Sequence, residues 1–208
     1  MSAHENLEHA EHAEHASHGG NKRIALLISV LALFLAFSET LGKSAQTAAL
    51  NYQIEASNLW NFFQAKSIRR TATLVAVDQT KLELLGTLTD EQKAAIGKQL
   101  DEWTKTAARY RSEPEAAEGK GEGTVELSRR AIEEQHSRDT ALSRYHMYEF
   151  GSAAFQIGIV LASAQVITGM VFLGWISALL GFAGLGFTSL GLWAPHALDF
   201  IMHGGGGH

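Results

Sequence analysis

Apolar residues are concentrated in two blocks, and charged residues fill the segment between them. No Lys, Arg, Asp or Glu occurs between Glu149 and Asp199. This stretch is about twice the roughly 20 residues that one helix needs to cross a hydrocarbon core. The pattern predicts a transmembrane helical hairpin over residues 150–194, with the apolar residues 169–172 as its turn.

A second apolar run, residues 24–37, follows Lys22 and Arg23. This run could be read as a signal peptide, but the polar leader of some 20 residues is long for a signal n-region. No convincing small-residue cleavage site followed by a mature start is present. An uncleaved transmembrane helix over residues 23–42 is therefore the favoured interpretation.

The segment between the two blocks, residues 43–149, is expected to be an extramembrane helical domain. Residues 44–85 contain neither Pro nor Gly, which predicts one long helix. Thr89 and Gln92 fit a capping box that opens a second helix over residues 89–111. A loop over residues 112–123 and a helix over residues 124–149 follow, and this last helix should continue directly into the membrane.

The first two of these helices should pack as an antiparallel hairpin, because the turn between them is short. One face of each carries apolar residues at helical spacing, and a helix of this kind needs a partner helix. The predicted interface residues are Tyr52, Leu59, Trp60, Phe63, Ile96, Leu100 and Trp103. The predicted fold class is therefore all-α, an integral membrane protein with three transmembrane helices and a long extramembrane helical bundle.

Small residues recur in the two C-terminal spans, and they let helices approach closely in lipid. Gly158, Gly174 and Gly181 are the predicted contact positions, and this pattern also favours self-association. Gln156 and Gln165 lie at membrane depth. Hydrogen bonding between packed helices is the favoured role for both, and lining a wet path is the alternative.

Composition narrows the function classes. The net charge is −5, and no basic patch with interleaved aromatic residues is present, so nucleic acid is not an expected partner. The absence of cysteine excludes disulfides, thiolate metal sites and cysteine nucleophiles. No Gly-rich phosphate loop, nucleophile elbow or metalloprotease pair is found, so no enzymatic activity and no cofactor are expected.

The leader, residues 1–22, contains an exact Glu-His-Ala repeat and is expected to be flexible. Its imidazoles could bind Zn, Ni or Cu, although a solvated low-complexity tail is the alternative interpretation. The candidate metal ligands are His9, His12, His15 and His18. Residues 195–208 form a second tail rich in Gly and His.

Three crossings place the leader on one side of the membrane, with the helical domain and the C-terminal tail on the other. Lys22 and Arg23 favour a cytoplasmic leader. The expected location is the bacterial inner membrane, with the helical domain on the opposite side.

The segment IEASNLWNFFQAKSIR, residues 54–69, carries a resemblance to a known family. It is similar to a motif in bacterial membrane proteins that are described only as a domain of unknown function. Those proteins share an N-terminal anchor, this helix, a charged helical middle and a C-terminal two-span hairpin. The resemblance covers about residues 24–193 and implies this fold, but it implies no activity.

Three functions are compatible with this organisation. The first is a non-enzymatic membrane scaffold or accessory subunit, either a homo-oligomer or part of a larger membrane complex, whose protruding helices mediate assembly. The second is a metal-binding or metal-responsive membrane protein that acts through its histidine leader. The third is a small channel or transporter. It ranks last because the C-terminal hairpin has no intramembrane acid or base.

Overall fold

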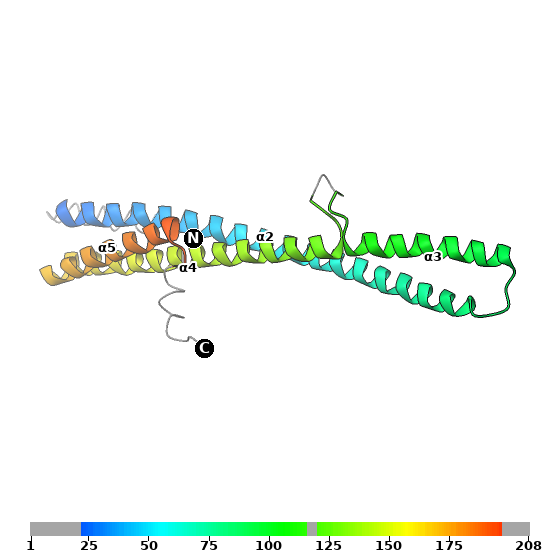
Figure 1. Ribbon diagram of the computed structural model, residues 1–208. Coiled ribbons are helices and arrows are strands. Elements are labelled where there is room, and N and C mark those ends of the chain that lie inside the picture. The colour runs from blue at the N-terminus through cyan, green and yellow to red at the C-terminus, as the bar shows by residue number, and fades with distance from the viewer. Residues whose placement is uncertain (1–21, 116–119, 197–208) are drawn as a thin grey trace, which may run out of the picture. The chain divides into compact units, whose positions relative to one another are not determined.

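The chain is all-α. The computed structural model describes residues 22–115 and 120–196, and within these it has helices but no strand. The helices are α2 (Lys22–Glu83), α3 (Asp90–Arg111), α4 (Thr124–Thr168) and α5 (Val171–Trp193), as Figure 1 shows. The leader and the last twelve residues, which include the four predicted histidine ligands, lie outside the described residues.

The chain divides into two compact units. The terminal unit contains the described residues up to Leu50 and those from Arg138 onward, and the central unit is Asn51–Ser137. Both α2 and α4 run through the two units without a break. The predicted boundary between a transmembrane helix and a separate long helix near Gly42 is therefore not a break in the helix. Gly42 is buried against Tyr148 and continues the helix.

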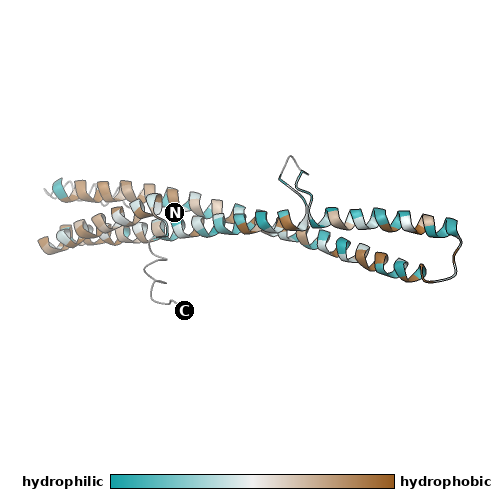
Figure 2. Cartoon of the chain, viewed as in Figure 1, coloured by the Kyte–Doolittle hydropathy of each residue, from teal (hydrophilic) through white to brown (hydrophobic). Residues whose placement is uncertain are grey.

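Among the described residues, three helices are long and apolar enough to cross a bilayer, namely α2, α4 and α5. Figure 2 shows their apolar residues gathered in the terminal unit, whereas polar and apolar residues mix along the helices of the central unit. Helix α4 ends at Thr168 and α5 ends at Trp193, but the predicted turn over residues 169–172 is too long, because Val171 and Phe172 already belong to α5. The turn between α4 and α5 is Gly169 and Met170, and Gly169 adopts a φ of 73°, which favours glycine.

The core of the terminal unit is made by α2 and α4. Its buried side chains are Ile24, Ile28, Leu31, Leu35, Phe155, Ile159 and Ala162. These residues recur every three or four positions on each helix, so the apolar stripes meet in one seam. Phe34 stacks on Phe155 with ring centroids 6.0 Å apart.

Helix α5 joins this seam through small residues. Its buried positions are Ser177, Gly181, Gly184, Thr188 and Gly191. The Ser177 hydroxyl donates to the Gly158 carbonyl oxygen at 2.7 Å, and the Thr188 hydroxyl lies 3.3 Å from that of Ser38. Close backbone approach and satisfied hydroxyl groups are the means by which helices pack in an apolar surrounding.

The central unit begins with a helical hairpin made by α2 and α3. The predicted capping box is confirmed: the Thr89 backbone N–H donates to Gln92 Oε1 at 2.9 Å, and the Gln92 backbone N–H donates to Thr89 Oγ1 at 3.3 Å. This box fixes the start of α3. Val77 on α2 and Ala107 on α3 are buried.

The connection from α3 to α4 is fixed to α2 by a buried lysine. The Lys66 ammonium lies 3.3 Å from the Glu122 carboxylate and 3.8 Å from that of Glu113, and it stands over the Phe62 ring. The Lys66 side chain is only 8% exposed, so it needs these carboxylates to compensate for its lost hydration.

Candidate functional site

Helix α2 carries two parallel stripes in the central unit, and one of them is covered by the chain itself. Along the covered stripe, successive positions are separated alternately by three and four residues, which is the spacing of a coiled-coil seam. The covered positions are Ala56, Leu59, Phe63, Lys66, Arg70, Thr73 and Val77, all buried or half-buried. Leu59 forms a buried cluster with Leu127 and Ala131 of α4.

The second stripe lies on the opposite side of α2 and is uncovered. Apolar residues fall at strict seven-residue spacing, at Ile54, Ile68, Val75 and Leu82, with Asn61 at the remaining position of the series. A second series of positions lies four residues after the first and contains Asn58, Ala65, Ala72 and Gln79. All nine residues are exposed, and Ile68 is 69% exposed. We call these nine residues the exposed stripe.

The exposed stripe is hollowed at its middle. Ile68, Ala72 and Val75 line a shallow groove of about 520 Å³ together with Ser67, Thr71, Ala76 and Gln79. Every residue that lines this groove belongs to α2. The seven include no charged residue, so a second apolar helix would bury no charge when it lies there.

The structure places the predicted interface residues of the central unit in different surroundings. Trp60 and Phe63 pack against the Leu59 cluster and against each other, edge to face at 5.3 Å. On α3, Ile96, Leu100 and Trp103 are half-buried. Tyr52 does not join them, because it is 38% exposed. Its neighbours in register on α2, Ala49 and Ala56, are buried.

The three predicted glycines lie at helix contacts of the terminal unit. A Cβ on Gly158 would meet Leu31 Cδ1 at 3.3 Å, and one on Gly181 would meet Leu31 Cδ2 at 2.6 Å. Leu31 therefore fits between α4 and α5 at glycine positions. Gly174 faces the amide of Gln165, which is buried in this contact. The Gln165 Oε1 atom is buried there without a hydrogen-bond partner within the described residues, so the predicted hydrogen bond to a packed helix is not found for Gln165.

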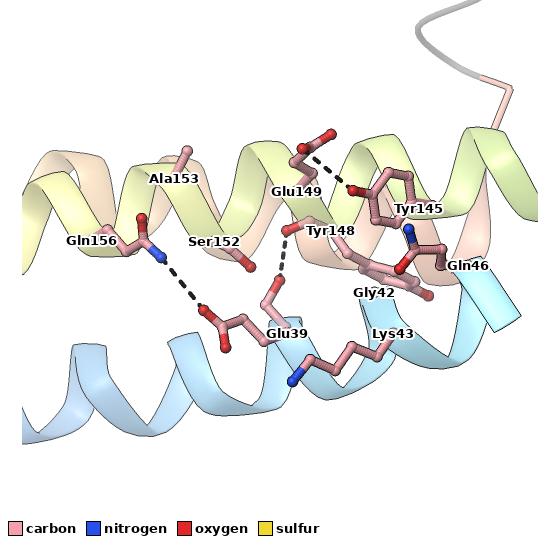
Figure 3. Close-up of a pocket in the computed structure, with 11 residues that line it drawn as sticks. Glu39, Gly42, Lys43, Gln46, Tyr145, Tyr148, Glu149, Ser152, Ala153 and Gln156 are labelled. Atoms are coloured by element: carbon pink, nitrogen blue, oxygen red, sulfur yellow. Dashed lines mark hydrogen bonds between the residues drawn. The ribbon is translucent and has the colours of Figure 1, made fainter. Parts of the chain in front are cut away.

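A polar groove of about 430 Å³ lies between α2 and α4 within the terminal unit. Figure 3 shows the Glu39 side chain of α2 pointing to Gln156 of α4, with Lys43 extended along α2. The Gln156 amide donates to the Glu39 carboxylate at 3.4 Å. The remaining lining residues are Ser38, Gly42, Gln46, Tyr145, Tyr148, Glu149 and Ala153.

One carboxyl of the central unit has a shifted pKa. Glu126, at the start of α4, is 8% exposed, and this burial acts to raise its pKa. Hydrogen bonds from the Ser112 hydroxyl and the Glu113 backbone N–H act in the opposite direction and hold the pKa below its usual 4.5. Glu126 therefore acts as an anionic anchor for the α3–α4 connection.

Metal binding has no support in the part of the chain that the structure describes, since no three His, Asp or Glu side chains there are grouped to hold an ion. The histidine prediction concerns residues outside that part. Two surfaces remain as candidate sites: the exposed stripe and the polar groove.

Sequence reasoning missed both surfaces. The exposed stripe is visible in the sequence as apolar residues seven apart, but the same helix also carries an aromatic stripe, and spacing alone does not say which of the two the chain covers. The polar groove is formed by two segments more than 100 residues apart, so no local sequence pattern predicts it. The one signal was Glu39, an acid that follows an apolar run without a break in the helix.

Comparison with known proteins gives a family and no further match. A search of curated proteins and a search of solved structures each find nothing similar. One family model matches residues 20–194, which include all four helices. The chain therefore belongs to the family described as Domain of unknown function (DUF4337).

Proposed function

We propose that this protein is a non-enzymatic membrane scaffold that self-assembles through the exposed stripe on α2. The terminal unit would span the bacterial inner membrane with its leader in the cytoplasm. The central unit would stand on the opposite side and present the exposed stripe to a second copy. The observation that carries the proposal is that α2 has apolar heptad positions on two opposite sides, of which its own chain covers one.

A second copy of this chain suits the exposed stripe because of its orientation. Two copies anchored in one membrane by the same helix present their α2 helices in parallel. In a parallel pair, identical residues of a heptad seam meet across the two-fold axis. Ile68 would then face Ile68, and Val75 would face Val75.

Asn61 adds a reason for a defined partner. It occupies one position of the seven-residue series that is otherwise apolar. A buried Asn in such a seam favours one register, because it is best satisfied by the same Asn on a partner helix. Asn58 and Gln79 of the second series would meet their own counterparts in the same register. An Asn–Asn pair across the axis is what a symmetric parallel dimer supplies.

The estimated free energy of burying the exposed stripe is large enough for association. The series Ile54 to Leu82 spans about 42 Å of helix. Covering its four exposed apolar side chains on both copies contributes on the order of 10 kcal/mol. Association costs roughly 4–15 kcal/mol in solution. Anchoring in one membrane raises the effective concentration and lowers that cost.

The proposal is tested by the mass of the full-length protein in detergent, measured by light scattering during size exclusion. Ile68→Glu should shift the protein from dimer to monomer, because two carboxylates would be buried face to face. Ile132→Glu is the matched control, since Ile132 is also exposed but lies on α4, outside the exposed stripe. A wild-type monomer, or equal effects of the two substitutions, would contradict the proposal.

A further inference from the structure

Helix α5 carries large apolar side chains on the side that the chain itself does not cover. The exposed ones are Val171, Phe172, Trp175, Leu179, Phe182, Leu190, Leu192 and Trp193. Most small residues of α5 are buried or half-buried, with Gly186 and Ser189 as exposed exceptions. Helices associate in lipid through small residues, and those of α5 are mostly used against the chain's own helices. The exposed side of α5 therefore suits lipid better than a second copy of the chain.

Two tryptophans stand near the ends of this exposed side. Trp175 is 75% exposed and Trp193 is 88% exposed. They are 18 residues apart, which is five turns of an α-helix, so both lie on the same face and about 27 Å apart. The hydrocarbon core of a bilayer is about 30 Å thick. Tryptophan is enriched at both membrane interfaces, where its apolar ring meets acyl chains and its N–H reaches polar groups.

Two contacts fix how α5 lies along α2 within the terminal unit. A Cβ on Gly181 would meet the Leu31 side chain, and the Thr188 hydroxyl lies 3.3 Å from that of Ser38. Each contact joins a residue of α5 to the residue 150 positions earlier on α2. The two helices therefore run in the same direction, and each level on α2 has a known counterpart on α5.

This offset places each tryptophan beside a charged end of the apolar segment of α2. Trp175 falls level with Ala25, two residues after Arg23, and Trp193 falls level with Lys43. From Arg23 to Lys43 the helix rises about 30 Å. Glu39 is the one charged residue between them on α2, and it lies one turn from Lys43. The tryptophans of one helix and the charges of another thus mark the same apolar layer.

We infer that the exposed side of α5 faces lipid, with Trp175 at the headgroups of one leaflet and Trp193 at those of the other. The inference rests on the membrane placement in the proposed function, but not on self-assembly. The partner groups are the ester and phosphate oxygens of phospholipids, which accept a hydrogen bond from the indole N–H. Phe182, between the two tryptophans, lies among the acyl chains.

The test is fluorescence quenching of the full-length protein in phosphatidylcholine vesicles. The lipid carries bromine either near the ester end of its acyl chains (shallow) or near their methyl end (deep). Trp193→Phe leaves Trp175 on α5, and Trp175→Phe leaves Trp193. The double variant measures the background from the tryptophans of the central unit. In each single variant, shallow bromine should quench about twofold more strongly than deep bromine, because the ring lies at the interface.

Phe182→Trp in the double variant is the matched control, since Phe182 is 76% exposed on the same side of α5 and near the middle of the span. It should show the opposite order, with stronger quenching by deep bromine. Deep quenching of Trp175 or Trp193, or shallow quenching at position 182, overturns the inference. Weak quenching at all three positions by both lipids overturns it as well, because protein rather than lipid would then cover this side.

The outcome is separable from that of the scaffold proposal. The Ile68→Glu variant should lose self-association and keep the shallow, deep, shallow order along α5. A wild-type monomer that shows this order would overturn self-assembly alone. A chain that stays monodisperse without any amphiphile and shows no quenching would overturn the membrane placement and this inference together.

Discussion

Glu126 is the residue that most tightly links the α3–α4 connection to the start of α4. Its carboxylate accepts hydrogen bonds from the Ser112 hydroxyl and the Glu113 backbone N–H. These donors need the ionised form. Protonation would leave a buried contact with fewer hydrogen bonds, so the geometry of the connection is linked to pH.

This linkage predicts a pH dependence of stability. Because the pKa of Glu126 is lowered in the folded chain, its contribution is present above its ordinary value of 4.5 and is lost as the pH falls through the lower folded pKa. Thermal unfolding by circular dichroism in detergent, between pH 7 and pH 3, should show a steeper loss of stability for wild type than for Glu126→Gln. Parallel pH profiles of the two proteins would argue against this role.

At the scale of elements, two glycines in the central unit have opposite expected roles. A Cβ on Gly123 would overlap Ser112 Cα and lie 2.7 Å from the Glu113 backbone nitrogen. These are backbone atoms, which cannot rotate away. Gly97 lies within α3, and a Cβ there meets nothing within 4 Å. The α3–α4 connection therefore requires glycine at position 123, whereas Gly97 only lowers the stability of α3.

Gly123→Ala should lower the stability of the protein by about 1–3 kcal/mol, because the overlap forces a backbone shift. Gly97→Ala should raise it by roughly 0.5–1 kcal/mol, since alanine loses less backbone entropy in a helix. Thermal unfolding in detergent measures both. Shifts of the same sign would show that the close packing at residues 112–126 does not govern the stability of the connection.

Helix identities and ends were largely predictable, because they depend on local signals. The capping box at Thr89 and the turn at Gly169 are such signals, and the structure has both. Local signals do not say which side of a helix its own chain covers. This is why Tyr52, which is in register with buried positions, is exposed, and why the exposed stripe had to be found in the structure.

The groove marks a second limit of sequence reasoning. Glu39 and Gln156 are 117 positions apart, and only the packing of α2 on α4 brings them together. The close contacts of Gly158 and Gly181 were predictable as a class, since small residues at helical spacing indicate tight packing. Their shared partner, Leu31, was not, because partner identity depends on the register between helices.

At the scale of the whole molecule, one helix serves both units. The first part of α2 packs in the core of the terminal unit, and its later part carries the exposed stripe. Anchoring this helix in a membrane would align the exposed stripes of neighbouring copies. The scaffold proposal therefore depends on two properties of the continuous helix α2. Its first part is apolar, and its later part carries the covered stripe on one side and the exposed stripe on the other.

A crosslinking experiment in native membranes tests the self-assembly most directly. The chain has no cysteine, so one introduced thiol reports on one position only. In a parallel seam, Ile68→Cys places two thiols within the few ångströms that a disulfide requires. Mild oxidation of intact membranes should give a disulfide-linked dimer for Ile68→Cys and none for Ile132→Cys. A monomer at Ile68→Cys under conditions that crosslink an established dimer would contradict the account.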